Sequence, residues 1–187
     1  AVLQVDTVGG LVTASGNYVN TQYATFSIGN SESGNFIDDT HQAIPFSSAN
    51  YATAGSGHIP AFGTSTDPAT TFTTAEGNGT RASDIVPCLW YVNDDISIDA
   101  IKSIEGADTA TGDTTRMHLF SYTFTSGATA CLKAGTLVGH NSDVTNAGSE
   151  QPYLSTWTVD SAAVSAGKVI LAFFRSDSVN SNYSIQV

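Results

Sequence analysis

The chain has 187 residues, of which 41% are hydrophobic and 12% are charged, and its formal net charge at pH 7 is −11. The aromatic share of 10% is enough for a packed core, so the low charge does not indicate disorder. Only six residues are basic and none precedes Arg81. Such a surface repels phosphate backbones and anionic lipids, which excludes nucleic acid as an expected partner, and no apolar run is long enough to predict membrane insertion.

Short apolar runs separated by Gly, Asn, Asp and Ser clusters recur along the chain, which is typical of β-sandwiches and barrels. The first 80 residues are expected to hold an N-terminal arm or outer strands joined by long loops. Their candidate strands are 3–5, 11–13, 23–28, 43–46, 58–62 and 71–74. Because the chain opens on Ala1, we expect either a processed form or a piece of a longer protein.

The strand pattern is sharper over residues 81–187, which we expect to form the core of one structural domain. The candidate strands there are 85–92, 96–104, 116–124, 130–138, 153–159, 168–175 and 183–187. Residues 160–166 are expected to form one helical turn capped by Asp160. Seven strands, with one or two from the first half, predict an all-β, antiparallel jelly-roll sandwich.

Two of the candidate strands, 85–92 and 168–175, are apolar on both faces, although a sandwich strand has only one inner face. The second face therefore needs a cover, either the N-terminal arm or a neighbouring subunit. We favour the subunit, because closed homo-oligomers are common, and expect a trimer. The residues expected at its interface are Leu89, Tyr91, Val169, Leu171 and Phe173.

Catalytic residues are not expected, because no nucleophile motif is present and the histidines are scattered. His118 alternates with Phe120 and Tyr122, so we expect a packed or interface histidine. Cys88 and Cys131 are expected to be buried thiols, although they would bridge if their strands were neighbours.

No cofactor is expected. Asp94 and Asp95 are weak candidates for a calcium site, as are Asp38 and Asp39, but neither pair has the spacing of a calcium-binding loop, and a solvated turn is the alternative. A recognition surface is expected on polar loops, because loops carry binding in such folds. The candidate recognition residues are Asn141, Asp143, Asn146, Gln151, Asn180 and Asn182.

Several stretches of the second half are similar to virion proteins. These stretches are DTATGDTTR (108–116) with LFSY (119–122), GHNSDVTNAG (139–148), STWTVD (155–160) and AGKVILAFFR (166–175). Together they resemble the C-terminal domains of structural proteins from tailed phages of marine bacteria, cyanophages especially. The resemblance spans roughly residues 85–187 and rests on general likeness, without a catalytic motif.

The resemblance implies a trimeric jelly roll on an extracellular virion, in a fibre or appendage that contacts a host glycan or protein. Its partners would be copies of itself and other virion proteins. The first alternative is a capsid decoration protein that stabilises the head. The second is a polysaccharide-degrading tailspike domain, for which no pair of carboxylates stands out in the sequence.

Overall fold

The computed structural model describes residues 2–5, 12–15, 22–29, 36–46, 59–77, 79–109, 112–146, 149–177 and 182–187. Strands account for nearly all of the regular secondary structure in these ranges, with one short helix and one 3₁₀ turn, and the strands that pair are antiparallel throughout. The predicted all-β class is therefore confirmed. No helix in the described part of the chain has the length and apolar character needed to cross a membrane.

The larger of two packed sheets has seven strands. Five of them follow the order β12-β9-β8-β14-β4, while β10 pairs with β8 and β5 pairs with β14. The long central strands are β8 (Thr114–Phe124), β9 (Leu132–His140) and β14 (Lys168–Ser176). The short ones are β4 (Gln42–Ile44), β5 (Trp90–Tyr91), β10 (Val144–Thr145) and β12 (Thr158–Val159). The central strands agree with the predicted ranges within two residues at each end.

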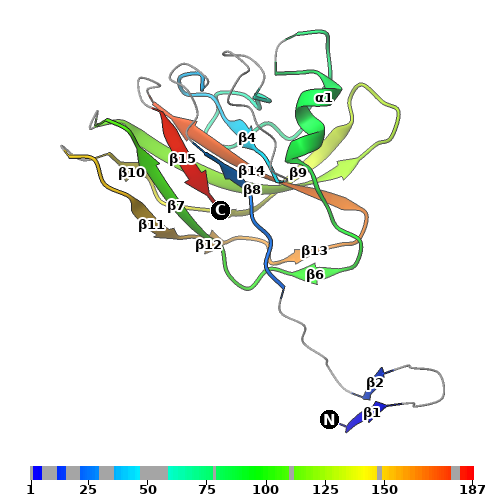
Figure 1. Cartoon of the computed structure of the whole chain (residues 1–187). Coiled ribbons are helices and arrows are strands. Elements are labelled where there is room, and N and C mark those ends of the chain that lie inside the picture. Colours follow the sequence, from blue (N-terminus) through cyan, green and yellow to red (C-terminus); the bar gives the residue numbers. More distant parts are fainter. Residues whose placement is uncertain are drawn as a thin grey trace.

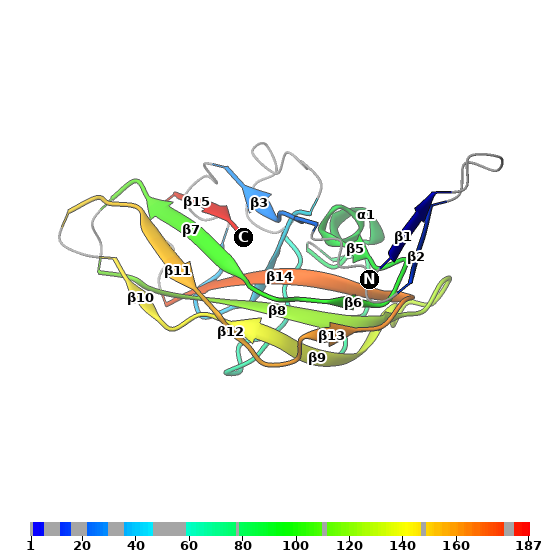
Figure 2. The same cartoon turned by 90° about the horizontal axis from the view of Figure 1, so that it is seen from below.

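The smaller sheet has the order β11-β7-β15-β3. Its strands are β3 (Ser27–Ile28), β7 (Lys102–Ala107), β11 (Tyr153–Thr156) and β15 (Tyr183–Gln186). It lies over the long strands β14 and β8 (Figure 2). Phe174 of β14 points into the space between the sheets, where its ring lies 5.0 Å from that of Tyr183. The two sheets therefore form an antiparallel sandwich.

Four further strands make two small sheets. A hairpin of β1 (Val2–Val5) and β2 (Val12–Ser15) is one, and β6 (Ile96–Ser97) with β13 (Ala163–Val164) is the other. The helical turn predicted over residues 160–166 is wrong, because this segment supplies β13. The strand predicted over residues 85–92 is also wrong. It contains the end of α1 (Ala82–Ile85), the 3₁₀ turn η1 (Val86–Cys88), in which Pro87 removes a backbone donor, and only then β5.

The outer face of the larger sheet is covered by residues 59–74, which we call the strap. The strap begins beside β4, where Ala43 donates a backbone hydrogen bond to Pro60. It ends beside β9, where Phe72 donates one to Leu132. Between these points the Phe62 ring packs on Phe173 of β14 at a centroid distance of 4.6 Å. The chain itself therefore covers the second apolar face of β14.

A glycine allows the strap to approach the sheet closely. A Cβ atom on Gly135 would lie 2.6 Å from Cε1 of Tyr122 and 2.9 Å from the Cα of Thr70 in the strap. The Tyr122 hydroxyl in turn donates to the strap carbonyl of Ala69 at 2.8 Å. The strap backbone therefore packs directly against the backbone of β9 at Gly135, where a larger residue would not fit without a shift of the chain.

The core draws on both halves of the chain. Apolar residues before position 80 are buried together with those that follow, among them Phe26, Ile44, Phe62 and Phe72. Cys88 and Cys131 are also buried and are free thiols, as expected. The sequence predicts an arm or outer strands up to residue 80 and the core from residue 81 onward. In the structure the core includes β3, β4 and the strap, all of which precede residue 80.

Candidate functional site

Four connections meet at one end of the sandwich, which we call the loop end (Figure 1, left). They join β7 to β8, β9 to β10, β10 to β11 and β14 to β15. Hydrogen bonds tie three of them to one another: Asn182 donates its backbone N–H to Asp108 at 2.9 Å, and Asn146 donates its side-chain N–H to the Thr109 carbonyl at 2.9 Å. The fourth loop, between β9 and β10, is tied to β8 instead, where Arg116 binds Asp143.

Most of the predicted recognition residues lie at this end, but several of them hold the loops together. Asn141 is buried, and its side-chain oxygen accepts the Met117 N–H at 2.6 Å. Asn146 is buried as well. The more accessible ones are Asp143, which pairs with Arg116, and Gln151, which donates to the Tyr153 hydroxyl at 2.9 Å. Asn180 lies outside the described residues.

A small cavity lies beneath the loop end, between the two sheets. It has a volume of about 10 Å³, close to the least that holds one water molecule. Its walls come from β7, β8, β10, β11 and β15, with Asn146 just after β10. The lining residues are Glu105, Gly106, Ala107, Thr115, Val144, Asn146, Tyr153 and Tyr183.

Glu105 is the ionisable group with the most unusual surroundings at this end. Its side chain is 4% exposed, Oε2 accepts the Thr115 hydroxyl at 2.8 Å, and Oε1 is buried without a hydrogen-bond partner. Burial raises the pKa of Glu105 to about 7, against the smaller lowering effect of the Thr115 hydrogen bond. The carboxyl therefore takes up and releases a proton near neutral pH.

The sequence pattern over residues 96–104 predicts one continuous strand, in which Ile96, Ile98 and Ile104 share the inner face and Ser103 lies opposite, so sequence reasoning missed Glu105. The chain instead leaves strand geometry after β6 and resumes at β7, and the alternation changes phase across the gap. Ile104 is consequently 50% exposed, while Ser103 and Glu105 face the core. A slip of one residue exchanges the two faces of a strand, and that is the error here.

Two of the four aspartates that are candidates for calcium binding make other contacts in the described part of the chain. Asp95 accepts the backbone N–H of Ala166 at 2.9 Å, so it closes a turn, and Asp94 is exposed beside it. Asp39 pairs with Arg175 at 2.7 Å. Nowhere in the described ranges do three His, Cys, Asp or Glu side chains converge to hold a metal ion.

Three histidines lie near one another on the strap side of the larger sheet. The rings of His41 and His118 are 4.8 Å apart, and those of His118 and His140 are 6.4 Å apart. His118 is 1% exposed, which confirms that it is packed. His140 is more accessible and binds Asp160 at 2.8 Å. The sequence placed none of these side chains together, because they come from segments far apart in the chain: His41 precedes β4, His118 is in β8 and His140 ends β9.

The expected interface residues separate into two groups. Val169, Leu171 and Phe173 are at most 2% exposed within one chain, so the need to cover them does not call for a second subunit. Tyr91 is 53% exposed and Leu89 is half-buried.

No protein-family model, curated protein or solved structure matches this chain.

Proposed function

We propose that this chain is a non-enzymatic, jelly-roll-type structural module of a phage virion that contacts the host surface through its loop end. The observation that carries the proposal is the gathering of four loops at one end of the sandwich, three of them joined by hydrogen bonds, which is how binding residues are commonly presented. The resemblance of residues 85–187 to virion domains supports the virion context. The chain also changes sheet between β7 and β8 and between β14 and β15, the kind of connection that jelly rolls use.

The charge of the loop end limits the surfaces it would bind. Its described part carries Asp108, Asp143, Glu150 and Asp177. The nearby bases Arg116 and Arg175, which are opposite each other on β8 and β14, pair with Asp143 and Asp39. Acidic surfaces repel acidic partners and attract neutral or basic ones at short range. A neutral glycan or a basic protein patch on the host envelope is therefore the proposed target.

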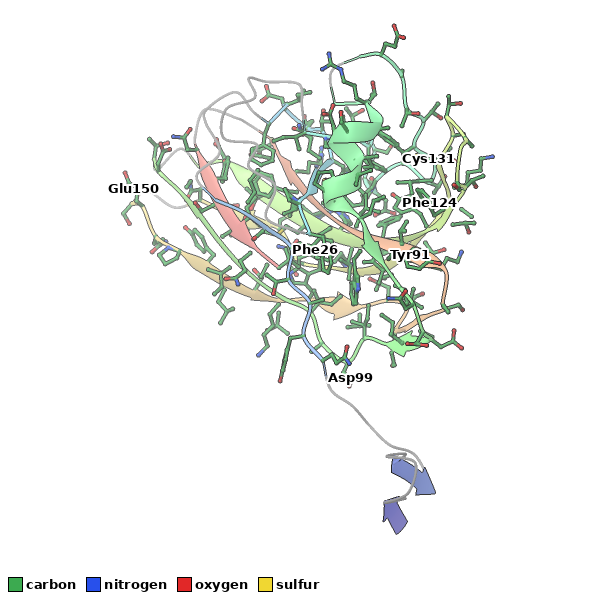
Figure 3. The ribbon with its side chains drawn as sticks, turned by 45° about the vertical axis from the view of Figure 1, so that its right-hand side comes forward. Phe26, Tyr91, Asp99, Phe124, Cys131 and Glu150 are labelled. Carbon is green, nitrogen blue, oxygen red and sulfur yellow. The ribbon has the colours of Figure 1, made fainter. Side chains whose placement is uncertain are left out.

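Two matched substitutions test the binding role of the loop end. Ser149 is exposed beside Glu150, and Ser126 is exposed in the turn after Phe124, on the opposite side of the molecule (Figure 3). Ser149→Lys is expected to weaken binding about tenfold, because it places bulk and charge on the contact surface. Ser126→Lys is expected to leave binding unchanged. The measurement is cosedimentation of the labelled chain with a panel of marine cyanobacterial cells.

Binding that both variants lose equally, or that neither loses, would contradict a role for the loop end. An absence of binding across the panel would count against host contact itself. Circular dichroism of each variant serves as the control that the sandwich is intact.

The proposed trimer has a surface available on the smaller sheet. Ile104 and Leu154 are opposite each other on β7 and β11, and they are 50% and 69% exposed. Light scattering is expected to give three times the chain mass of 19.4 kDa. Leu154→Lys is expected to yield monomers, while Val86→Lys, at another exposed apolar position, keeps the trimer. A monomeric wild type would overturn this part of the proposal.

Capsid decoration is the second candidate, and the N-terminal hairpin favours it. β1 and β2 pair with each other and with none of the other described strands. A two-stranded hairpin alone is only marginally stable in water, so a contact with a neighbouring protein would stabilise it. Electron microscopy of particles carrying a gold label on this chain separates the two functions: label on the fibres supports host contact, and label on the head supports decoration.

A further inference from the structure

The contact between the strap and the larger sheet contains two buried histidines. His41 precedes β4 and His118 lies on β8. Both residues are at most 1% exposed. Their rings meet edge to face, with an interplanar angle of 81°. Each ring also contacts the strap: Nε2 of His41 is 2.9 Å from the Ser65 carbonyl, and Nε2 of His118 is 3.5 Å from Asp67 Oδ1.

The hydrogen bonds of both rings are incomplete. Nδ1 of His41 and Nδ1 of His118 are buried and have no partner. A neutral imidazole loses little by leaving its acceptor nitrogen unpaired, but an imidazolium carries a proton on both nitrogens and needs two acceptors. Neither pocket supplies the second acceptor, so protonation would leave a buried N–H without a partner.

The charged groups that face the pair add to this cost. Arg175 approaches from β14, Arg116 from β8, and the third histidine, His140, from β9. Asp67 on the strap is the carboxylate nearest to His118, and its side chain is 56% exposed. Arg175, Arg116 and His140 have carboxylate partners of their own, namely Asp39, Asp143 and Asp160. Protonating either histidine thus adds positive charge where cations already gather, and solvent weakens the opposing anion.

We infer that His41 and His118 form an acid-operated latch, and that their protonation releases the strap from the larger sheet. Release would expose the aromatic face under the strap, which includes Phe120, Tyr122 and Phe173. The movement would remain local, because β8, β9 and β14 stay paired with one another. An acidic compartment or surface would then uncover an apolar patch that is hidden at neutral pH.

The direction and size of the effect follow from linkage. Burial first, and the nearby cations second, lower the pKa of His118 to about 3, and the pKa of His41 is also lowered by burial. A histidine freed by strap release regains the ordinary value of 6.5. The closed strap is therefore fully stabilised above pH 6.5 and loses stability as the pH falls toward 3. His118 alone raises the opening equilibrium about a hundredfold between pH 7.5 and pH 4.5.

Hydrogen exchange of the full chain, read by mass spectrometry at pH 7.5 and pH 4.5, tests the latch. Rates are divided by the intrinsic exchange rate at each pH. Protection of the amides of Phe62, Phe72 and Thr74, which bond strap to sheet or to the segments beside it, is expected to fall about a hundredfold in acid. Protection in β7 and β15 of the smaller sheet is expected to stay constant. Unchanged strap protection, or an equal loss in both sheets, would overturn the inference.

Matched leucine substitutions identify the groups responsible. His118→Leu is expected to remove most of the acid response of the strap. His140→Leu is the control, because that ring lies on the same face but is 37% exposed and pairs with Asp160 instead of the strap. A full acid response in the His118→Leu chain would also refute the latch. If that variant does not fold, the wild-type exchange at the two pH values decides the question alone.

Discussion

Replacing Phe62 by alanine is expected to lower the free energy of unfolding by about 3 to 5 kcal/mol, the usual cost of deleting a fully buried phenylalanine. Phe62 is 1% exposed and contacts three aromatic rings: Phe72 at 4.8 Å, Tyr122 at 5.8 Å and Phe173 at 4.6 Å. The strap that carries it also buries Ile59 and Phe72, but only the Phe62 ring packs on Phe173, Tyr122 and Phe72 together. Urea unfolding monitored by circular dichroism measures the change.

Phe124→Ala is the matched control, because it deletes the same side chain from the end of β8, where Phe124 is 40% exposed. We expect it to cost about 1 kcal/mol. Combining Phe62→Ala with Phe173→Ala is expected to cost less than the sum of the two by about 0.5 to 1.5 kcal/mol, because each removes the other's partner.

The same experiment shows whether the outer face of β14 is covered by the strap of the same chain or by a neighbouring subunit. If a neighbouring subunit covered the outer face, Phe62→Ala would cost little, and the unfolding midpoint would rise with protein concentration. The structure predicts a large loss of free energy of unfolding that does not depend on protein concentration. In that case the proposed trimer would form through other surfaces, such as the one that includes Ile104 and Leu154.

The long strands were predictable because apolar residues run through them without interruption. The range 168–175 is β14 but for its last residue, and 116–124 falls inside β8. The sequence also showed that β14 needs a cover on both faces. It did not identify the cover, since the apolar residues of the strap are separated by Thr, Ser and Asp, and its contacts join positions far apart, such as Phe62 and Phe173.

The candidate site was predicted in part. Polar loops such as those that carry Asn141 and Gln151 were expected to form it, and the structure gathers four loops at one end and joins three of them by hydrogen bonds. Glu105 and the pair of His41 and His118 were not expected together, because side-chain burial depends on strand register and on which strands become neighbours. A pattern of alternation gives the faces of a strand only while the strand is unbroken, and the gap between β6 and β7 removes that information.

Glu105→Gln is expected to change the pH dependence of stability more than any other single substitution at the loop end. The folded pKa of about 7 lies above the ordinary value of 4.5. The folded protein therefore holds this proton more tightly than the unfolded chain does. The contribution of Glu105 is most favourable below pH 4.5 and is lost as the pH rises through 7, with a total of about 3 kcal/mol.

Glutamine cannot ionise, so this loss is absent from the variant. The stability of Glu105→Gln relative to wild type is expected to rise by about 3 kcal/mol between pH 4 and pH 8, as measured by urea unfolding. Glu150→Gln serves as the control, because Glu150 is exposed in the same loop end. If the free energies of unfolding of the two variants changed equally between pH 4 and pH 8, the pKa of Glu105 would not be raised in the folded protein.

The buried histidines make the comparison between variants essential. His118 has a lowered pKa, so its contribution grows as the pH rises from about 3 to 6.5, while that of Glu105 shrinks from 4.5 to 7. Between pH 4.5 and 6.5 the two oppose each other, and the wild-type profile hides both. Glu105→Gln should leave stability that rises with pH over this window, because only the histidine contribution remains. In His118→Leu the free energy of unfolding should fall more steeply, or rise less, with pH between 4.5 and 6.5 than in the wild type. The reason is that the contribution of Glu105 is then opposed by His41 alone.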